Sequence, residues 1–180
     1  MTVPSAARIL ALTAALTAAA ALAAVPASGA PTASAATLVT LDTAVLAQLN
    51  RIRAQHDLAP LRLDAGLDEA ATAHTSEMLA DGYFSHDSAD GSPFSKRVRR
   101  YYSPAGRSFW SAGENLLWST GSLDAARAVA MWMSSPGHRA NILSPQWRDI
   151  GIAALAETDA PGAFGGATVT LITTDFGVRR

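Results

Sequence analysis

Three side chains have the chemical types needed to hold a metal ion or to transfer a proton, namely His86, Glu114 and His138. A neutral imidazole is a good zinc ligand, and a carboxylate either binds the metal or orients a ligating ring. Each of the three lies on or beside an expected loop, next to a glycine or a helix end, where functional residues concentrate. Their separations along the chain match no metal-binding spacing, so the residues alone do not place them together.

The standard catalytic motifs are absent from the sequence. It contains neither a G-x-S-x-G nucleophile elbow nor an H-E-x-x-H zinc helix. Because the 180 residues include no cysteine, a cysteine nucleophile and any zinc site that uses cysteine are excluded. Two arrangements stay open although no spacing marks them: a Ser–His–Asp triad through Ser85 or Ser135, and a glycosidase-like carboxyl pair of Glu114 with Asp87.

One basic cluster stands out, and it comprises Lys96, Arg97, Arg99 and Arg100, followed by Tyr101 and Tyr102. Its place on an expected short helix favours a solvated helix face. The alternative is a contact for an anionic surface polymer or a lipid headgroup. The whole chain has 14 Lys+Arg against 15 Asp+Glu, so it lacks the basic footprint of nucleic-acid binding, and we expect no nucleic-acid partner.

The first 36 residues have the composition of a secretory signal peptide followed by a processed segment. They carry one charge, Arg8, then an apolar run rich in alanine and a series of small residues. The run is too alanine-rich for a convincing membrane span, although a retained N-terminal anchor is the alternative. Both Val25-Pro26-Ala27 and Ala33-Ser34-Ala35 fit the cleavage pattern. We expect residues 37–180 to form one secreted domain, extracellular or associated with the cell envelope, with membrane contact only through the signal peptide.

Apolar residues at helical spacing predict helices over 38–56, 65–81, 93–100, 123–133 and 138–143. Asp64 and Gly82 are suited to cap the second helix, whereas Ser92 and Ser122 are expected N-caps of the third and fourth. The face expected to point inward on the second helix consists of Leu67, Ala71, His74 and Met78. On the fourth helix it consists of Leu123, Ala126, Val129 or Ala130, and Met133.

The last part of the chain changes to the pattern of strands. Segments 113–119, 149–156 and 167–176 are the strand candidates, and the last is rich in Thr, Val and Ile. The glycine- and proline-containing segment between the last two favours a long hairpin. Helices followed by strands, without repeated βαβ units, predict an α+β architecture.

Several segments in this order resemble bacterial domains of the CAP superfamily, which comprises cysteine-rich secretory proteins, antigen 5 and pathogenesis-related 1. The most specific segment runs from Trp132 through Pro136-Gly137-His138-Arg139 to Leu143. Gly113-Glu114-Asn115 resembles the GEN motif of the family. The others are Leu49–Arg53, Leu58–Leu61, Ala73–Met78, Phe84-Ser85-His86, Ile150-Gly151-Ile152 and Asp175-Phe176-Gly177.

The resemblance covers residues 38–178 and implies an α-β-α sandwich with a small antiparallel sheet between helical layers. It also implies a cleft lined by two histidines and two acids, which in several members holds a divalent cation, often zinc. Carried over position by position, the histidines are His86 and His138, which would be the metal ligands, and one acid is Glu114. The second acid should lie before Trp132, but residues 126–130 contain no carboxylate, which weakens the expected metal site.

Two further residues belong to the expected cleft. Asn115 is expected to tie loops together, and His74 is either a core histidine or a residue at the cleft edge. All the candidate histidines and Glu114 also have a purely structural interpretation, in which they hydrogen-bond to the backbone and brace the loops.

The function expected from these features is that of a secreted, monomeric binding or effector protein whose cleft takes a divalent cation, with zinc as the first candidate. Its partner would be a cell-envelope polymer, a lipid or another protein. The alternative is a metal-assisted extracellular hydrolase acting on peptide or cell-wall material, with Glu114 as the base. Sterol or lipid carriage, which some eukaryotic relatives perform, has no specific support in this sequence.

Overall fold

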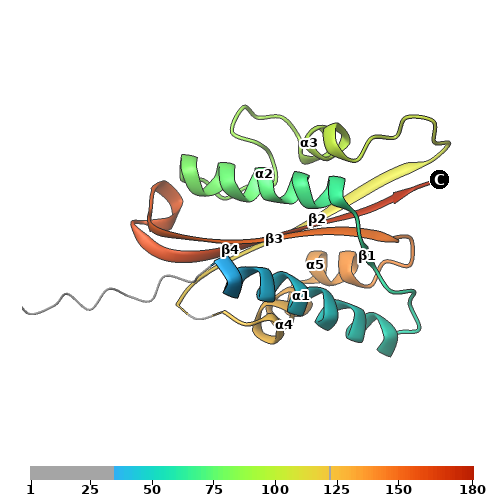
Figure 1. Cartoon of the computed structure of the whole chain (residues 1–180), viewed down its shortest axis with the longest axis horizontal. Helices are drawn as coiled ribbons and strands as arrows, with labels where there is room; N and C mark the ends of the chain where they lie inside the picture. The colour runs from blue at the N-terminus through green and yellow to red at the C-terminus, as the bar shows by residue number, and fades with distance from the viewer. Residues whose placement is uncertain (1–34, 122) are drawn as a thin grey trace, which may run out of the picture.

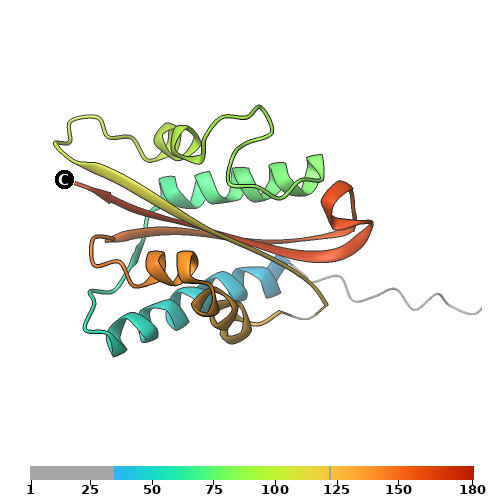
Figure 2. The same cartoon turned by 180° about the vertical axis from the view of Figure 1, so that it is seen from behind.

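The structure is a computed structural model that describes residues 35–121 and 123–180, and it is a sandwich of three layers. A four-stranded sheet lies between two sets of helices (Figure 1). One face is covered by α2 (Ala65–Asp81) and α3 (Phe94–Tyr101), and the other by α1 (Ala35–Gln55), α4 (Ala125–Ser134) and α5 (Pro136–Ile142). The view from behind shows the same layers (Figure 2). The predicted α-β-α architecture is therefore confirmed.

The sheet has the strand order β1-β3-β4-β2. Its long strands β2 (Trp110–Thr120), β3 (Asp149–Ala160) and β4 (Ala167–Arg179) pair antiparallel, and β3 and β4 form the expected hairpin through the 3-10 turn Gly162–Phe164. All three strands were predicted, but each runs longer than its apolar pattern. The two-residue β1 (Arg62–Leu63) pairs parallel to β3. It was not predicted, because two exposed residues after a proline carry no alternation.

Helix α2 has the bounds and caps that its sequence predicts. The carboxylate of Asp64 accepts hydrogen bonds from the backbone N–H groups of Gly66 and Leu67, and Gly82 ends the helix in the left-handed conformation with a φ of 69°. All four residues of its predicted inward face are buried.

Two of the predicted N-caps differ from the structure. Helix α4 begins at Ala125 and its N-cap is Asp124, whose carboxylate accepts from the Arg127 N–H, while Ser122 lies outside the described residues. Helix α3 follows Pro93 without a side-chain cap, because the hydroxyl of Ser92 instead bonds to Asp90. In both places a neighbouring aspartate, a stronger acceptor than serine, decides the local geometry.

The inward face of α4 was also predicted partly wrong. Its buried residues are Ala125, Ala128, Val129 and Trp132, whereas Ala126 is exposed and Leu123 and Met133 are only partly buried. The indole of Trp132 occupies the core and donates to the carbonyl of Leu116 at 3.0 Å. One large side chain therefore decides which face of α4 points into the core. The alanine-rich pattern around it could not predict that face.

The larger apolar core lies between the sheet and the α1–α4–α5 layer, with Val45, Leu49 and Phe176 at its centre. A second cluster around Met78 and Leu171 lies beneath α2. Among the described residues, no helix is long and apolar enough to cross a membrane. Residues 1–34 of the predicted signal peptide lie outside the described residues.

Candidate functional site

The edge strand β2 positions the central residues of the candidate site. Successive side chains of a strand point to opposite faces of the sheet. Glu114 consequently faces the α2–α3 layer, where it meets His86 and Arg97, while Asn115 faces α5, where it meets His138 and Asn141. Because β2 is the last strand of the sheet in the described part of the chain, groups from both helical layers can reach the same edge.

Glu114 is held by the imidazole of His86 and the guanidinium of Arg97. Its Oε1 lies 2.7 Å from Nδ1 of His86, and its Oε2 accepts from the Arg97 guanidinium at 2.5 Å. The Glu114 side chain is only 1% exposed, so these contacts compensate the cost of burying its charge. Both carboxylate oxygens are thus engaged with other side chains of the protein.

His86 lies at the surface of this arrangement, with a side chain that is 52% exposed. The hydrogen bond to Glu114 raises the pKa of His86 above its ordinary value, against the opposing effect of partial burial. The same bond occupies Nδ1 and leaves Nε2 as the free ring nitrogen. A carboxylate that orients a histidine in this way is the usual companion of a ligating imidazole.

His138 approaches the same edge from α5, on the other face of the sheet. Its backbone carbonyl accepts from Asn115 at 3.1 Å, and Asn141 donates both to the Asn115 side chain and to the Glu114 carbonyl. Burial and then the charge of His86 lower the pKa of His138. The structure therefore brings the two imidazoles within electrostatic range, although they belong to opposite layers. Asn115 connects strand β2 to helix α5.

Arg97 is a site residue that the sequence did not reveal. It was read as part of a solvated basic face, but it is buried, and in addition to Glu114 its guanidinium donates to the carbonyl of His86 at 3.3 Å and to the Ser88 hydroxyl at 2.9 Å. It therefore fixes both the carboxylate and the backbone of the loop that carries His86. The position of Arg97 next to the apolar Val98 on a short helix could have indicated that its side chain points inward.

Asp175 is a second acid that the sequence analysis did not select. It pairs across the sheet with Glu114, on the same face, and is fully buried. Burial first, and the neighbouring charge of Glu114 second, hold the pKa of Asp175 well above its usual range. Asp175 is therefore an acid beside Glu114, but it lies in β4 rather than on the helix before Trp132, and solvent does not reach it.

His74 is entirely buried in α2, beneath the loop that leads to His86. Its Nε2 donates to the carbonyl of Ser85 at 2.9 Å, and its Nδ1 lies 3.4 Å from Glu77. Burial lowers its pKa, so the neutral ring predominates near neutral pH. Of the two roles that were open for His74, this geometry matches the core histidine that supports the loop.

The fit of a divalent cation rests on the two histidines. Within residues 35–121 and 123–180, no group of three or more His, Cys, Asp or Glu side chains is arranged to hold a metal ion. Glu114 already has both oxygens engaged, so its geometry fits the orientation of His86 rather than direct ligation. Nε2 of His86 and the ring of His138 are the nitrogens that remain, and water would complete the coordination.

Comparison with known proteins agrees with the arrangement of these elements. Residues 46–169 match the family model described as CAP, the cysteine-rich secretory protein family. The uncharacterized protein YkwD of Bacillus subtilis (strain 168) is 36% identical over 109 residues, which are 60% of this chain and 40% of YkwD. The uncharacterized membrane protein YlbC of the same organism is 31% identical over 113 residues, which are 63% of this chain and 31% of YlbC.

A solved structure gives the same result for the fold. It is an extracellular protein containing an SCP domain from Bacillus anthracis, with 26% identity and a TM-score of 0.60, and the match covers 80% of this chain and 42% of that one. The chain thus spans less than half the length of each of these three relatives. Since the family model covers well over half of its residues, the chain belongs to the CAP family of cysteine-rich secretory proteins.

Proposed function

We propose that this chain acts outside the cytoplasm as a binding module, with its ligand cleft at the β2 edge between His86 and His138. Support for the location comes from the signal-peptide composition of residues 1–36, and from the Bacillus anthracis relative, which is described as extracellular. YlbC is described as a membrane protein, and its name therefore suggests a second form of this proposal, in which the chain is attached to the cell envelope.

A divalent cation, zinc in the first instance, belongs to the proposed cleft. The observation that carries this step is the 2.7 Å contact of Glu114 with Nδ1 of His86, which directs Nε2 of the same ring outward. The lowered pKa of His138 keeps that imidazole neutral near neutral pH, which is the form that binds metals. A cation held there would attract an anionic or carbonyl group of the ligand.

The geometry favours binding over hydrolysis. A general base needs an oxygen within reach of a water or substrate proton. In this structure Glu114 is almost completely buried and bonds to His86 and Arg97, so it would first have to release one of them. We therefore assign Glu114 the role of positioning His86.

The test is a calorimetric zinc titration of the metal-free chain. We expect saturable binding that His86→Ala and His138→Ala each weaken by about tenfold or more, because each removes one of two protein ligands. Glu114→Gln should weaken it by a smaller factor, since the ligand stays but loses its orienting charge. His56→Ala provides the matched control, because this exposed histidine near the end of α1 lies outside the cleft.

Zinc affinity that is unchanged in both cleft variants would contradict the proposal. A complete lack of zinc binding by the wild-type chain would also contradict the cation, although the family membership would stand. Far-UV circular dichroism of each variant separates a lost ligand from a lost fold.

A further inference from the structure

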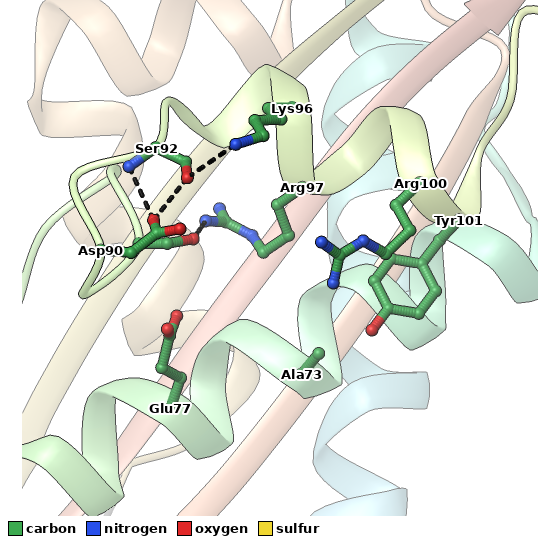
Figure 3. A pocket seen from close by; sticks show the side chains of 9 residues that line it. Ala73, Glu77, Asp90, Ser92, Lys96, Arg97, Arg100 and Tyr101 are labelled. Carbon is green, nitrogen blue, oxygen red and sulfur yellow. Dashed lines mark hydrogen bonds between the residues drawn. The ribbon is translucent and has the colours of Figure 1, made fainter.

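A pocket lies between α2 and the segment that runs from Ser88 through α3 (Figure 3). The cavity has a volume of about 320 Å³. Arg97 separates it from the cleft, because the guanidinium that holds Glu114 also lines this pocket. Its other charged and polar residues are Glu77, Ser88, Asp90, Ser92, Lys96, Arg100 and Tyr101.

The hydrogen-bond acceptors of the pocket are already engaged. Glu77 accepts from the hydroxyl of Tyr83 at 2.7 Å and from the backbone N–H of Ala89 at 3.3 Å. Asp90 accepts from the backbone N–H and the hydroxyl of Ser92. These contacts partly satisfy both negative charges before any ligand arrives.

The donors that α3 contributes to the pocket are much less engaged. Within the described part of the chain, Arg100 and the hydroxyl of Tyr101 form no hydrogen bond or close ion pair, and Lys96 reaches only the Ser92 hydroxyl, at 3.4 Å. Nε of Arg97 is buried and has no partner among those residues. Figure 3 shows the Arg100 guanidinium directed into the pocket, across from Asp90 and Ser92. An excess of free donors on one wall is the arrangement that an oxyanion requires.

The arrangement of the donors indicates which class of anion the pocket fits. Arg100, Lys96 and Tyr101 approach from different parts of α3 rather than in one plane, which suits a tetrahedral phosphate better than a flat carboxylate. The volume lies at the lower end of small-molecule sites and exceeds what a free phosphate fills. Glu77 and Asp90, which retain lone pairs, can accept from hydroxyl groups.

We propose that this pocket binds a phosphate ester of a small polyol, with the phosphate against Arg100 and Tyr101 and the hydroxyl groups against Glu77 and Asp90. The same chemistry occurs in a soluble polyol phosphate and in the headgroup of an anionic lipid. The site is independent of the proposed cation, so each stands or fails by its own measurement.

The experiment is a calorimetric titration of the full chain with glycerol 3-phosphate, compared with glycerol and with inorganic phosphate. We expect saturable binding of the ester, weaker binding of inorganic phosphate, and none of glycerol. Arg100→Gln and Tyr101→Phe should each lower the affinity by about tenfold, because each removes a hydrogen bond to a charged group. Arg107→Gln is the matched control, since it removes the same charge from an exposed position outside the pocket.

Vesicles distinguish the two sources of the phosphate. Binding to phosphatidylglycerol vesicles but not to phosphatidylcholine vesicles, lost in Arg100→Gln, identifies the lipid headgroup, whereas binding of the soluble ester without vesicle binding identifies the free compound. The proposal is overturned if neither glycerol 3-phosphate nor the anionic vesicles bind. It is equally overturned if Arg107→Gln weakens binding as much as Arg100→Gln, since the interaction would then be a general charge effect.

Discussion

Glu114 shows how far the candidate site could be predicted from the sequence. Its place beside a glycine, within a motif that resembles the GEN segment of the family, identified it together with His86 and His138. Composition and spacing could not, because the three residues meet only through long-range packing. Arg97 was missed for the opposite reason, since a basic helix is normally solvated and only the burial of one arginine shows its role.

Asp175 was missed because the sequence does not indicate whether a carboxylate within an apolar strand is protonated. Two carboxyl groups paired across a sheet, one of them fully buried, cannot both carry charge cheaply. Burial and the charge of Glu114 raise the pKa of Asp175, and this favours the neutral acid beside Glu114.

At this scale we predict the effect of Glu114→Gln on the titration of His86. The substitution removes the hydrogen bond to the carboxylate and its charge while Arg97 stays nearby, so the pKa of His86 should fall. Histidine NMR as a function of pH, in metal-free buffer, measures this shift. Glu69→Gln, an exposed position of α2, should leave the His86 titration unaltered. An unshifted His86 in Glu114→Gln would show that the two side chains are not in contact.

Among the elements, helix α2 is the one whose bounds and caps were predicted most accurately, and its backbone packs very closely against strand β3. Its length, both caps and its buried face follow from local sequence, because each depends on residues within the helix or next to it. Its distance from the sheet does not, because that depends on Gly151 of β3. A Cβ added at Gly151 would lie 2.0 Å from the backbone carbon of Leu67. The glycine therefore lets α2 approach the strand closely enough to support His74 and the loop above it.

We therefore predict that Gly151→Ala destabilises the protein by about 3 kcal/mol, since backbone must move to admit one methyl group. Urea denaturation measures this change. Gly137→Ala is the matched control, because nothing lies within 4 Å of the added Cβ and the residue is in helix α5. It should stabilise by about 0.5–1 kcal/mol. Equal stability of the two variants would contradict the close packing of α2 on β3.

On the scale of the whole molecule, the layered architecture and the family follow from the order of the motifs. The pH dependence of stability does not, because it is set by two carboxyl groups, partly buried Asp42 and fully buried Asp175. Burial raises the pKa of Asp42 to about 7, and the charge of Asp68 adds to this effect. Asp42 and Asp175 are both more acidic in the unfolded chain than in the folded one. Their contribution to stability is therefore complete below pH about 4 and is lost as the pH rises through the folded pKa values.

The expected outcome is a free energy of unfolding that declines between about pH 4 and pH 7 more than in Asp42→Asn. The difference should reach about 1–2 kcal/mol at neutral pH, once solvent screening of this partly exposed group is included. Asp175→Asn should stabilise in the same direction, because its amide mimics the protonated acid. Urea titrations over this pH range measure both. Parallel pH profiles for the wild type and Asp42→Asn would contradict the raised pKa.

The convergence of His86 and His138 on one cleft is the claim on which the proposed function rests, and side-chain nitrogen NMR during a zinc titration tests it most directly. If the account is right, the ring nitrogens of these two histidines shift together, at the same zinc concentration, and His86 responds at Nε2 rather than at Nδ1. The buried His74 and the distant His56 keep their positions. Separate responses of His86 and His138, at different zinc concentrations, would mean that the two rings do not share a site.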